Sequence, residues 1–119
     1  VALLRCRDRE LLRASCQRAR RLLPGFSPQG ISNTLYALGL LRYRDRELLQ
    51  EVCASLPPRL GDFSAQGLSN SLYGLGLLRF GPVAFLEALC SHVPGRLPDF
   101  TPQNVSNTLY SLAALEFRH

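Results

Sequence analysis

Three sets of amide and aromatic side chains recur 37 residues apart, and these are the side chains best suited to recognising a ligand. In each set an Asn follows a Gln by four residues and a Tyr follows the Asn by three, so a helix would place them on one face. Amides can form hydrogen bonds with base edges and tyrosines can stack on bases, so a surface that reads nucleic acid could be built from them. The sets are Gln29, Asn33 and Tyr36; Gln66, Asn70 and Tyr73; and Gln103, Asn107 and Tyr110.

A structural role would suit the same side chains. The Gln and Asn residues could form a hydrogen-bonded ladder that holds successive repeats in register, because buried amides commonly serve packing. Tyrosines at helical spacing are common in protein cores. Since the sets do not vary from one repeat to the next, they could not distinguish one base from another.

Arginine at repeated positions is a second candidate for contact with a polyanion. Arg5, Arg42 and Arg79 are 37 residues apart, and so are Arg59 and Arg96. Guanidinium groups at this interval could follow a phosphate backbone through bidentate hydrogen bonds. Alternatively, an arginine at the C-terminal end of a helix could complement the helix dipole and its unsatisfied carbonyl groups.

The net charge of +5 is confined to the N-terminal part of the chain. Residues 1–25 contain seven Arg against two acidic residues, whereas basic and acidic residues balance over residues 26–119. A dense basic patch suits a polyanion or an acidic protein surface. A solvated helix face would have the same composition. The patch comprises Arg13, Arg18, Arg20 and Arg21.

The cysteines and histidines do not indicate catalysis. Cys16, Cys53 and Cys90 share one position in successive repeats, where packed helices would hold them about 8–10 Å apart, too far for disulfides. We therefore expect small core residues at this position. The cysteine spacing matches no zinc site, and His92 and His119 belong to no arrangement with a nucleophile or a carboxylate. We expect no metal, no cofactor and no enzymatic activity.

An internal repeat carries all of these residues. Residues 26–62 and 63–99 are identical at 19 of 37 positions without a gap. The N-terminal segment LRCRDRELL likewise matches LRYRDRELL 37 residues later. We therefore divide the chain into the C-terminal part of a first repeat, with its second helix (1–25), two full repeats (26–62 and 63–99), and the first helix of a further repeat (100–119).

The sequence of each repeat predicts two helices. Ser27, Ser64 and Thr101 suit the N-cap of the first helix, and Asp45 suits that of a second helix. Prolines then end the second helix, because proline cannot continue it. Since so short a pair exposes an apolar face that only a neighbour can cover, we expect an all-α fold whose pairs stack as an α-solenoid.

An apolar stripe and two small flanks define the first helix of the repeat. Glycines on the flanks, such as Gly39 and Gly74, would let neighbouring first helices approach closely, so we expect these helices to line the concave side. The amide and tyrosine residues lie opposite the stripe, which we expect to pack on the second helix. The stripe comprises Ile31, Leu35 and Leu38; Leu68, Leu72 and Leu75; and Val105, Leu109 and Leu112.

Size and composition limit the class of protein. A chain of 119 residues can form one domain, and a hydrophobic content of 46% is ordinary for a globular protein. No apolar run approaches the length that crosses a bilayer, and we expect no membrane contact. The N-terminus has no secretory or transit-like character, and we expect the chain to be a segment of a longer protein.

The pattern FSPQGISNTLYALGLL at 26–41, with its two copies, resembles the octotricopeptide-type repeats. The period of 37 residues is similar to that of the related heptatricopeptide repeats, and the resemblance covers nearly the whole chain. It implies an α-solenoid in a mitochondrion or plastid that acts on organellar RNA. Related proteins also occur in ribosomes, where they hold fragmented ribosomal RNA. Tyr36, Tyr73 and Tyr110 stand where many family members have Trp.

We therefore expect a non-catalytic RNA-binding protein of the mitochondrion, or alternatively of the plastid. In its most specific form, the expectation is a mitochondrial ribosome subunit that stabilises rRNA beside neighbouring proteins of a ribonucleoprotein assembly. The alternative is a protein–protein scaffold in a large organellar assembly that makes no direct contact with RNA. The balanced charge of residues 26–119 favours this alternative.

Overall fold

The computed structural model describes residues 6–116, which form α-helices joined by short 3₁₀ helices, with no strand among them. The predicted all-α class is therefore confirmed. The elements are α1 (Cys6–Leu22), η1 (Leu23–Gly25), α2 (Pro28–Leu41), α3 (Arg46–Ser55), η2 (Pro57–Asp62), α4 (Ala65–Leu78), α5 (Val83–His92), η3 (Val93–Asp99) and α6 (Pro102–Glu116).

The helices α2, α4 and α6 begin at the predicted hydroxyl caps. The Oγ atoms of Ser27 and Ser64 each accept a hydrogen bond of 3.0 Å from the backbone amide three residues later. Thr101 and Asn104 cap each other, since each side chain accepts a bond of 3.1 Å from the other's backbone amide. Asp45 caps α3 in the same way as the serines, at 3.0 Å. Caps of this kind contribute about 1 kcal/mol each.

Both α2 and α4 end at an arginine in the left-handed conformation, Arg42 (φ 57°) and Arg79 (φ 53°). The Arg42 amide donates to the carbonyl three residues earlier, and the Tyr43 amide donates to the carbonyl five residues earlier, at 3.1 and 3.0 Å. Arg79 and Phe80 repeat both bonds, so each helix ends in a Schellman motif. Glycine usually occupies this position, because a left-handed L-residue costs about 1–2 kcal/mol.

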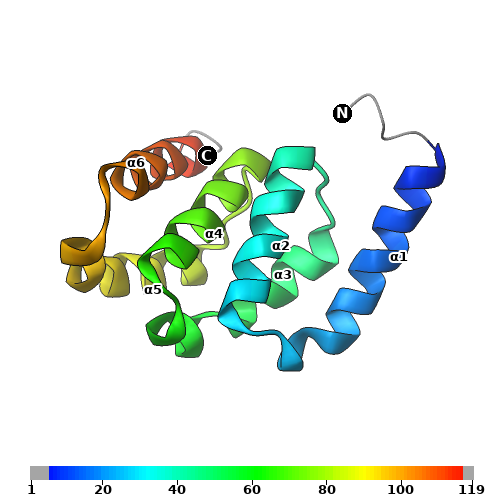
Figure 1. Ribbon diagram of the computed structural model, residues 1–119, viewed down its shortest axis with the longest axis horizontal. Helices are drawn as coiled ribbons and strands as arrows, with labels where there is room; N and C mark the ends of the chain where they lie inside the picture. The colour runs from blue at the N-terminus through cyan, green and yellow to red at the C-terminus, as the bar shows by residue number, and fades with distance from the viewer. Residues whose placement is uncertain (1–5, 117–119) are drawn as a thin grey trace.

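Figure 1 shows α6, α4, α2 and α1 following one another across the molecule, with α1 and α6 at opposite ends. The helices α2 and α4 meet where their glycines face each other. A methyl group on Gly39 would lie 2.7 Å from the Cα of Gly74, and one on Gly74 would overlap the Leu35 carbonyl. Between α4 and α6, a methyl group on Gly76 would lie 2.9 Å from the Cα of Ser111. The predicted close approach of these helices is therefore confirmed.

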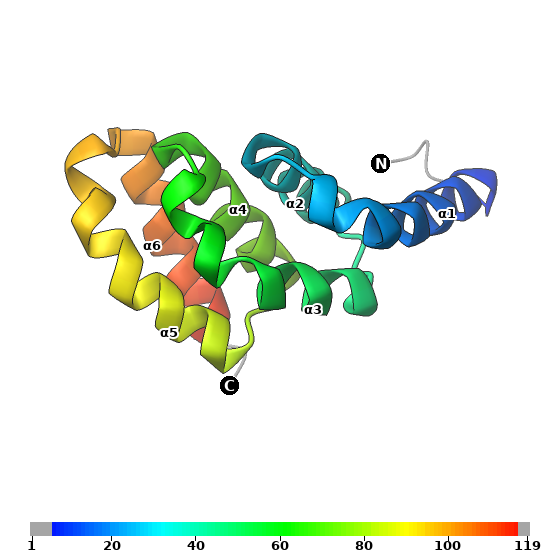
Figure 2. The same cartoon turned by 90° about the horizontal axis from the view of Figure 1, so that it is seen from below.

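The helices α3 and α5 form a second row beneath α2 and α4 (Figure 2). The apolar stripes of α2 and α4 are buried in one hydrophobic core, to which both rows of helices contribute. Leu35, Leu49 and Leu75 have no exposed surface. At the N-terminal end, α1 packs against α3 and contributes Cys16 to this core, and η1 contributes Leu23. One core thus joins both rows of helices with α1.

The stripe of α6 differs from its counterparts, because Val105, Leu109 and Leu112 are 39, 63 and 42% exposed. The equivalent residues Leu35 and Leu72, which α3 and α5 cover, are 0 and 2% exposed. In the described part of the chain no second helix follows α6, and its stripe borders a groove shared with Leu89 and Val93. For α6, the packing of this stripe on a second helix therefore stays a prediction.

Candidate nucleic-acid interface

The amide and tyrosine side chains of α2, α4 and α6 lie on the side of these helices away from the core, as the helical spacing predicts. We call this surface the amide–tyrosine face. Its three N-terminal amides, Gln29, Gln66 and Gln103, are exposed, and so is Asn33. Asn70 and Asn107 are half-buried between neighbouring helices.

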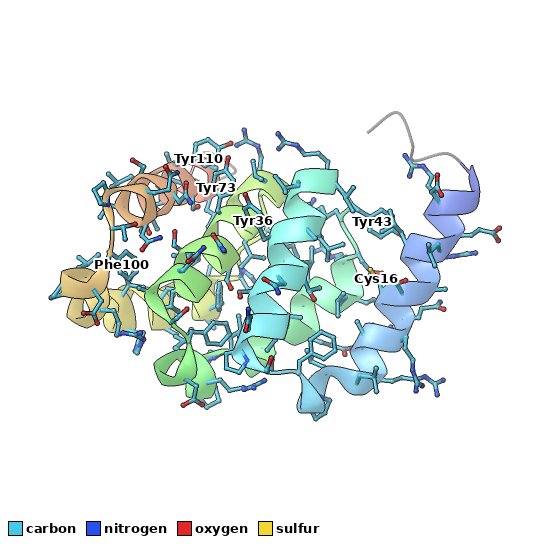
Figure 3. The ribbon with its side chains drawn as sticks, in the orientation of Figure 1. Cys16, Tyr36, Tyr43, Tyr73, Phe100 and Tyr110 are labelled. Atoms are coloured by element: carbon cyan, nitrogen blue, oxygen red, sulfur yellow. The ribbon has the colours of Figure 1, made fainter. Side chains whose placement is uncertain are left out.

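Tyr36, Tyr73 and Tyr110 form a row across α2, α4 and α6 (Figure 3). The ring centroids of Tyr36 and Tyr73 are 6.0 Å apart with planes inclined by 35°, and those of Tyr73 and Tyr110 are 5.5 Å apart at 51°. These values are typical of packed aromatic pairs. Tyr110 is 44% exposed and the other two rings are half-buried. The rings therefore join neighbouring helices and still present part of their surface to solvent, so they are not core residues.

A groove of about 520 Å³ lies between the N-terminal halves of α2 and α4. The amides of Gln29, Asn33, Gln66 and Asn70 line it. Within the described residues, none of these four amides forms a hydrogen bond with another protein group. On α6 the amides bond within one helix, where Gln103 Nε2 donates to Asn107 Oδ1 at 3.0 Å. The amides thus do not form the ladder between repeats that a structural role predicted.

Sequence reasoning missed part of the groove. Ser27 and Ser64 were assigned only as helix caps, yet both line it, and so does the exposed Asp62. Asp62 and Asp99 are 37 residues apart, so the repeat itself could have identified this position. The Asp62 carboxylate would repel a phosphate, so the groove should contact the uncharged parts of a nucleic acid.

The repeated arginines at the helix ends contact the neighbouring helix. The side chain of Arg42 donates to the carbonyl of Leu77 at 3.2 Å, and that of Arg79 donates to the carbonyl of Ala114 at 3.3 Å. Both arginines bind carbonyls in the last turn of the next helix, which matches the alternative that they complement helix C-termini. Their other N–H groups remain at an exposed surface. The third member, Arg5, lies outside the described residues.

Arg59 and Arg96 each join the end of a repeat to the beginning of the same repeat. Their Nη2 atoms donate to the carbonyls of Phe26 and Phe63, in both cases over 2.7 Å. Arg96 also lies 3.3 Å from the imidazole of His92. Both guanidinium groups are half-buried. Their donors are therefore directed into the protein, and a phosphate backbone could not use them freely.

The basic patch of α1 is only partly available to a ligand. Arg20 donates to Glu51 at 2.6 Å and 2.9 Å and to Glu47 at 3.2 Å. Its hydrogen bonds with Glu51 raise the pKa of Arg20 further, so the guanidinium stays charged and joins α1 to α3. Arg13 lies 3.8 Å from Glu10 in an exposed pair, which stabilises little. Arg18 and Arg21 are exposed.

The described residues contain no cluster of His, Cys, Asp and Glu that could hold a metal. Burial raises the pKa of Cys53 to about 12. Burial, with the nearby Asp45, raises that of Cys16 to about 11, so both thiols stay protonated and inert near neutral pH. These two are the predicted small core residues. Cys90 is exposed, so the prediction is wrong for this cysteine, which borders the uncovered stripe of α6.

The fold and the amide–tyrosine face define an all-helical protein with a repeated, uncharged polar surface. Within residues 6–116, no helix combines the length and the apolar composition that a membrane crossing requires. A comparison with known families matches residues 3–119 to the family described as RESC6, RNA-editing substrate-binding complex 6 protein, and the chain belongs to this family. Proteins of this family function in mitochondrial RNA editing. No curated protein and no solved structure matched the chain.

The family match corrects two expectations. The assignment to the octotricopeptide and heptatricopeptide repeats is wrong, because the matching family is that of an RNA-editing complex. The expected role in a mitochondrial ribosome has no support for the same reason. The broader expectation of a protein associated with organellar RNA agrees with the family.

Proposed function

We propose that this chain is a non-catalytic component of a mitochondrial RNA-editing assembly and that it binds single-stranded RNA along the amide–tyrosine face. The observation that carries the proposal is the groove between α2 and α4, whose four side-chain amides bond to no protein group among residues 6–116. Side-chain amides offer donors and acceptors together, as base edges do. The family description, which names RNA-editing substrate binding, supports RNA as the ligand.

The tyrosine row supports single strands over duplexes. Bases stack on aromatic side chains only when they have left a base-paired helix, and each such contact contributes about 1–3 kcal/mol. The rings of Tyr36, Tyr73 and Tyr110 lie beside the amides on the same three helices. Because the sets are the same in each repeat, the proposed binding has little dependence on sequence.

The phosphates require a separate set of residues. Arg18 and Arg21, together with Arg13, are the strongest candidates, because they are exposed on α1 and none is held in a buried contact. Arg42 and Arg79 can contribute through the N–H groups that do not bind the next helix. We no longer assign phosphate contacts to Arg20, Arg59 and Arg96, whose guanidinium groups bind carboxylates or backbone carbonyls.

We further propose that the helices form an α-solenoid of 37-residue repeats, with boundaries at 1–25, 26–62, 63–99 and 100–119. The recurrence of the caps, the Schellman ends and the arginine contacts at this interval supports the division. In this arrangement the first helices of the repeats, α2, α4 and α6, would line the concave side and present the amide–tyrosine face to an extended ligand.

The proposal is tested by measuring RNA affinity against salt concentration. The unaltered chain should show a clear negative slope, because phosphate contacts release counterions. The double variant Asn33→Ala with Asn70→Ala should bind more weakly with the same slope, whereas Gln50→Ala, an exposed amide on α3, should bind normally. The double variant Arg18→Glu with Arg21→Glu should make the slope less steep by about 1.4, because each phosphate contact on a single strand contributes about 0.7 to its magnitude. A slope near zero for the unaltered chain would contradict RNA binding.

A protein–protein scaffold is the second candidate. It is favoured by the internal use of the repeated arginines and by the balanced charge of residues 26–119. If the chain is a scaffold, the amide substitutions should not reduce the amount of RNA in the assembly. Its affinity for a protein partner should not show the linear dependence on log salt concentration that phosphate contacts produce.

A further inference from the structure

One carboxylate lies among the uncharged side chains of the groove between α2 and α4. It belongs to Asp62, the last residue of η2. Asp62 lies between the buried Leu60 and Phe63, whose backbones are joined by a hydrogen bond of 3.2 Å. The Asp62 side chain is exposed and forms no hydrogen bond or ion pair within residues 6–116. Its two oxygens can therefore accept hydrogen bonds from a ligand in the groove.

The rest of the groove provides hydrogen-bond donors in addition to these acceptors. Four side-chain amides line the same space, those of Gln29, Asn33, Gln66 and Asn70. Each offers an NH₂ group that donates and an oxygen that accepts. The volume of about 520 Å³ lies within the range of about 300–1,000 Å³ that small-molecule sites occupy. A single flat base can thus enter the groove and meet one carboxylate and several amides.

Guanine is the base that offers a carboxylate two hydrogen bonds. Its Watson–Crick edge carries two adjacent donors, N1–H and N2–H, so the two oxygens of one carboxylate can accept both. Adenine and cytosine place an unprotonated ring nitrogen beside their amino group, and uracil places its single N3–H between two carbonyls. A carboxylate oxygen that faces any of these acceptors is repelled. An amide of the groove can in turn donate to O6 of guanine.

We propose that Asp62 makes this groove selective for guanine, whose N1–H and N2–H both donate to the carboxylate. The proposal rests on the proposed binding of RNA along the amide–tyrosine face, and it names the base that one groove takes. The repeated amides still accept any base elsewhere along the face. The preference therefore concerns one nucleotide of an extended strand.

The next repeat has the same carboxylate at Asp99, but its surroundings differ. Gln103 and Asn107 bond to each other there, at 3.0 Å, so two of the equivalent amides are already paired. The side chain of Asn104 also occupies the position at which α4 has Gly67. Asp99→Asn is therefore a matched control for Asp62→Asn.

The experiment compares guanine with hypoxanthine, which lacks the N2 amino group and is otherwise identical. A short oligouridine carries one guanosine or one inosine at its centre, and fluorescence anisotropy at a fixed salt concentration measures its affinity. The unaltered chain should bind the guanosine strand about fivefold more tightly, the lower end for a bidentate contact with a base, because Asp62 is exposed. Asp62→Asn should lose this preference, since an amide puts a donor where the N2 amino group needs an acceptor. Asp99→Asn should keep it.

Both aspartates are exposed, so circular dichroism should show unchanged helix content in both variants. Equal affinity of the unaltered chain for the two strands would overturn the assignment of guanine. If Asn33→Ala with Asn70→Ala still weakened the binding of both strands, RNA binding along the face would stand without it. A preference that survives Asp62→Asn, or that disappears in Asp99→Asn, would also overturn the assignment. Binding to neither strand would overturn both proposals.

Discussion

At the scale of single residues, the arginines show how a repeated side chain can have different roles. Sequence spacing identified Arg59 and Arg96 as a pair, but it could not show that each binds a carbonyl 33 residues earlier in the chain. That partner is brought close only when the two helices of one repeat pack against each other. The amides Asn33 and Asn70 were predictable as surface residues, because their position opposite the apolar stripe follows from helical geometry alone.

Replacing Arg96 should therefore reduce stability more than RNA binding. Arg96→Met removes a charged donor from the carbonyl of the buried Phe63, which should lower the free energy of unfolding by about 1.5–3 kcal/mol. The exposed Arg46 provides the control, since Arg46→Met should change stability by less than about 0.5 kcal/mol. Urea denaturation measures both. Unchanged stability together with a weaker salt dependence of RNA binding would instead assign Arg96 to a phosphate.

The buried thiols predict a loss of stability at alkaline pH. An unperturbed thiol has a pKa of 9.0, whereas Cys16 and Cys53 have values raised to about 11 and about 12. The unfolded chain thus releases these protons first, so stability is full below pH 9.0 and falls as pH rises from there to about 12.

The comparison of the unaltered chain with Cys53→Ala isolates this effect from the titration of tyrosines. Unfolding followed at several pH values should show a shallower alkaline decline in the variant. An identical decline in both chains would mean that the Cys53 thiol is not kept protonated by the fold.

At the scale of helices, the sequence predicted where most of them begin and that prolines end the second helix, but not how the first helix of each repeat ends. Ser27, Ser64 and Thr101 gave clear caps, whereas the 3₁₀ helices that contain the prolines, and that bury Leu60 and Val93, were not predicted. Arg42 in the left-handed conformation contradicts its intrinsic preference. Its side-chain bond to the next helix offsets part of that cost, and no local pattern could have indicated it.

The closest approach of two helices gives the sharpest prediction at this scale. Gly74→Ala would place a methyl group against the backbone of Leu35, so α2 and α4 must separate. Overpacking of this kind should destabilise the fold by about 1–3 kcal/mol or more. Gly61 has open space around it, and Gly61→Ala should leave stability unchanged or slightly higher. If thermal unfolding shows equal effects for the two substitutions, the contact between α2 and α4 is looser than described.

At the scale of the whole molecule, the repeat predicted the order of the helices, but the two ends behave differently from the middle. The exposure of Leu109 and Cys90 depends on which neighbours are present, and an identical position in the sequence does not reveal that. The mistaken family assignment has a related cause. Caps, apolar stripes and small flanks are requirements of stacked helices in general, so unrelated families that stack helices share them.

The central claim is that RNA lies along α2, α4 and α6, and ultraviolet cross-linking tests it most directly. A single-stranded RNA should be cross-linked to the chain and the attached peptides identified by mass spectrometry. We predict attachment at Tyr36, Tyr73 and Tyr110, with additional contacts at α1 through its arginines. Cross-links that avoid all three tyrosines, or that fall on α3 and α5, would contradict the claim.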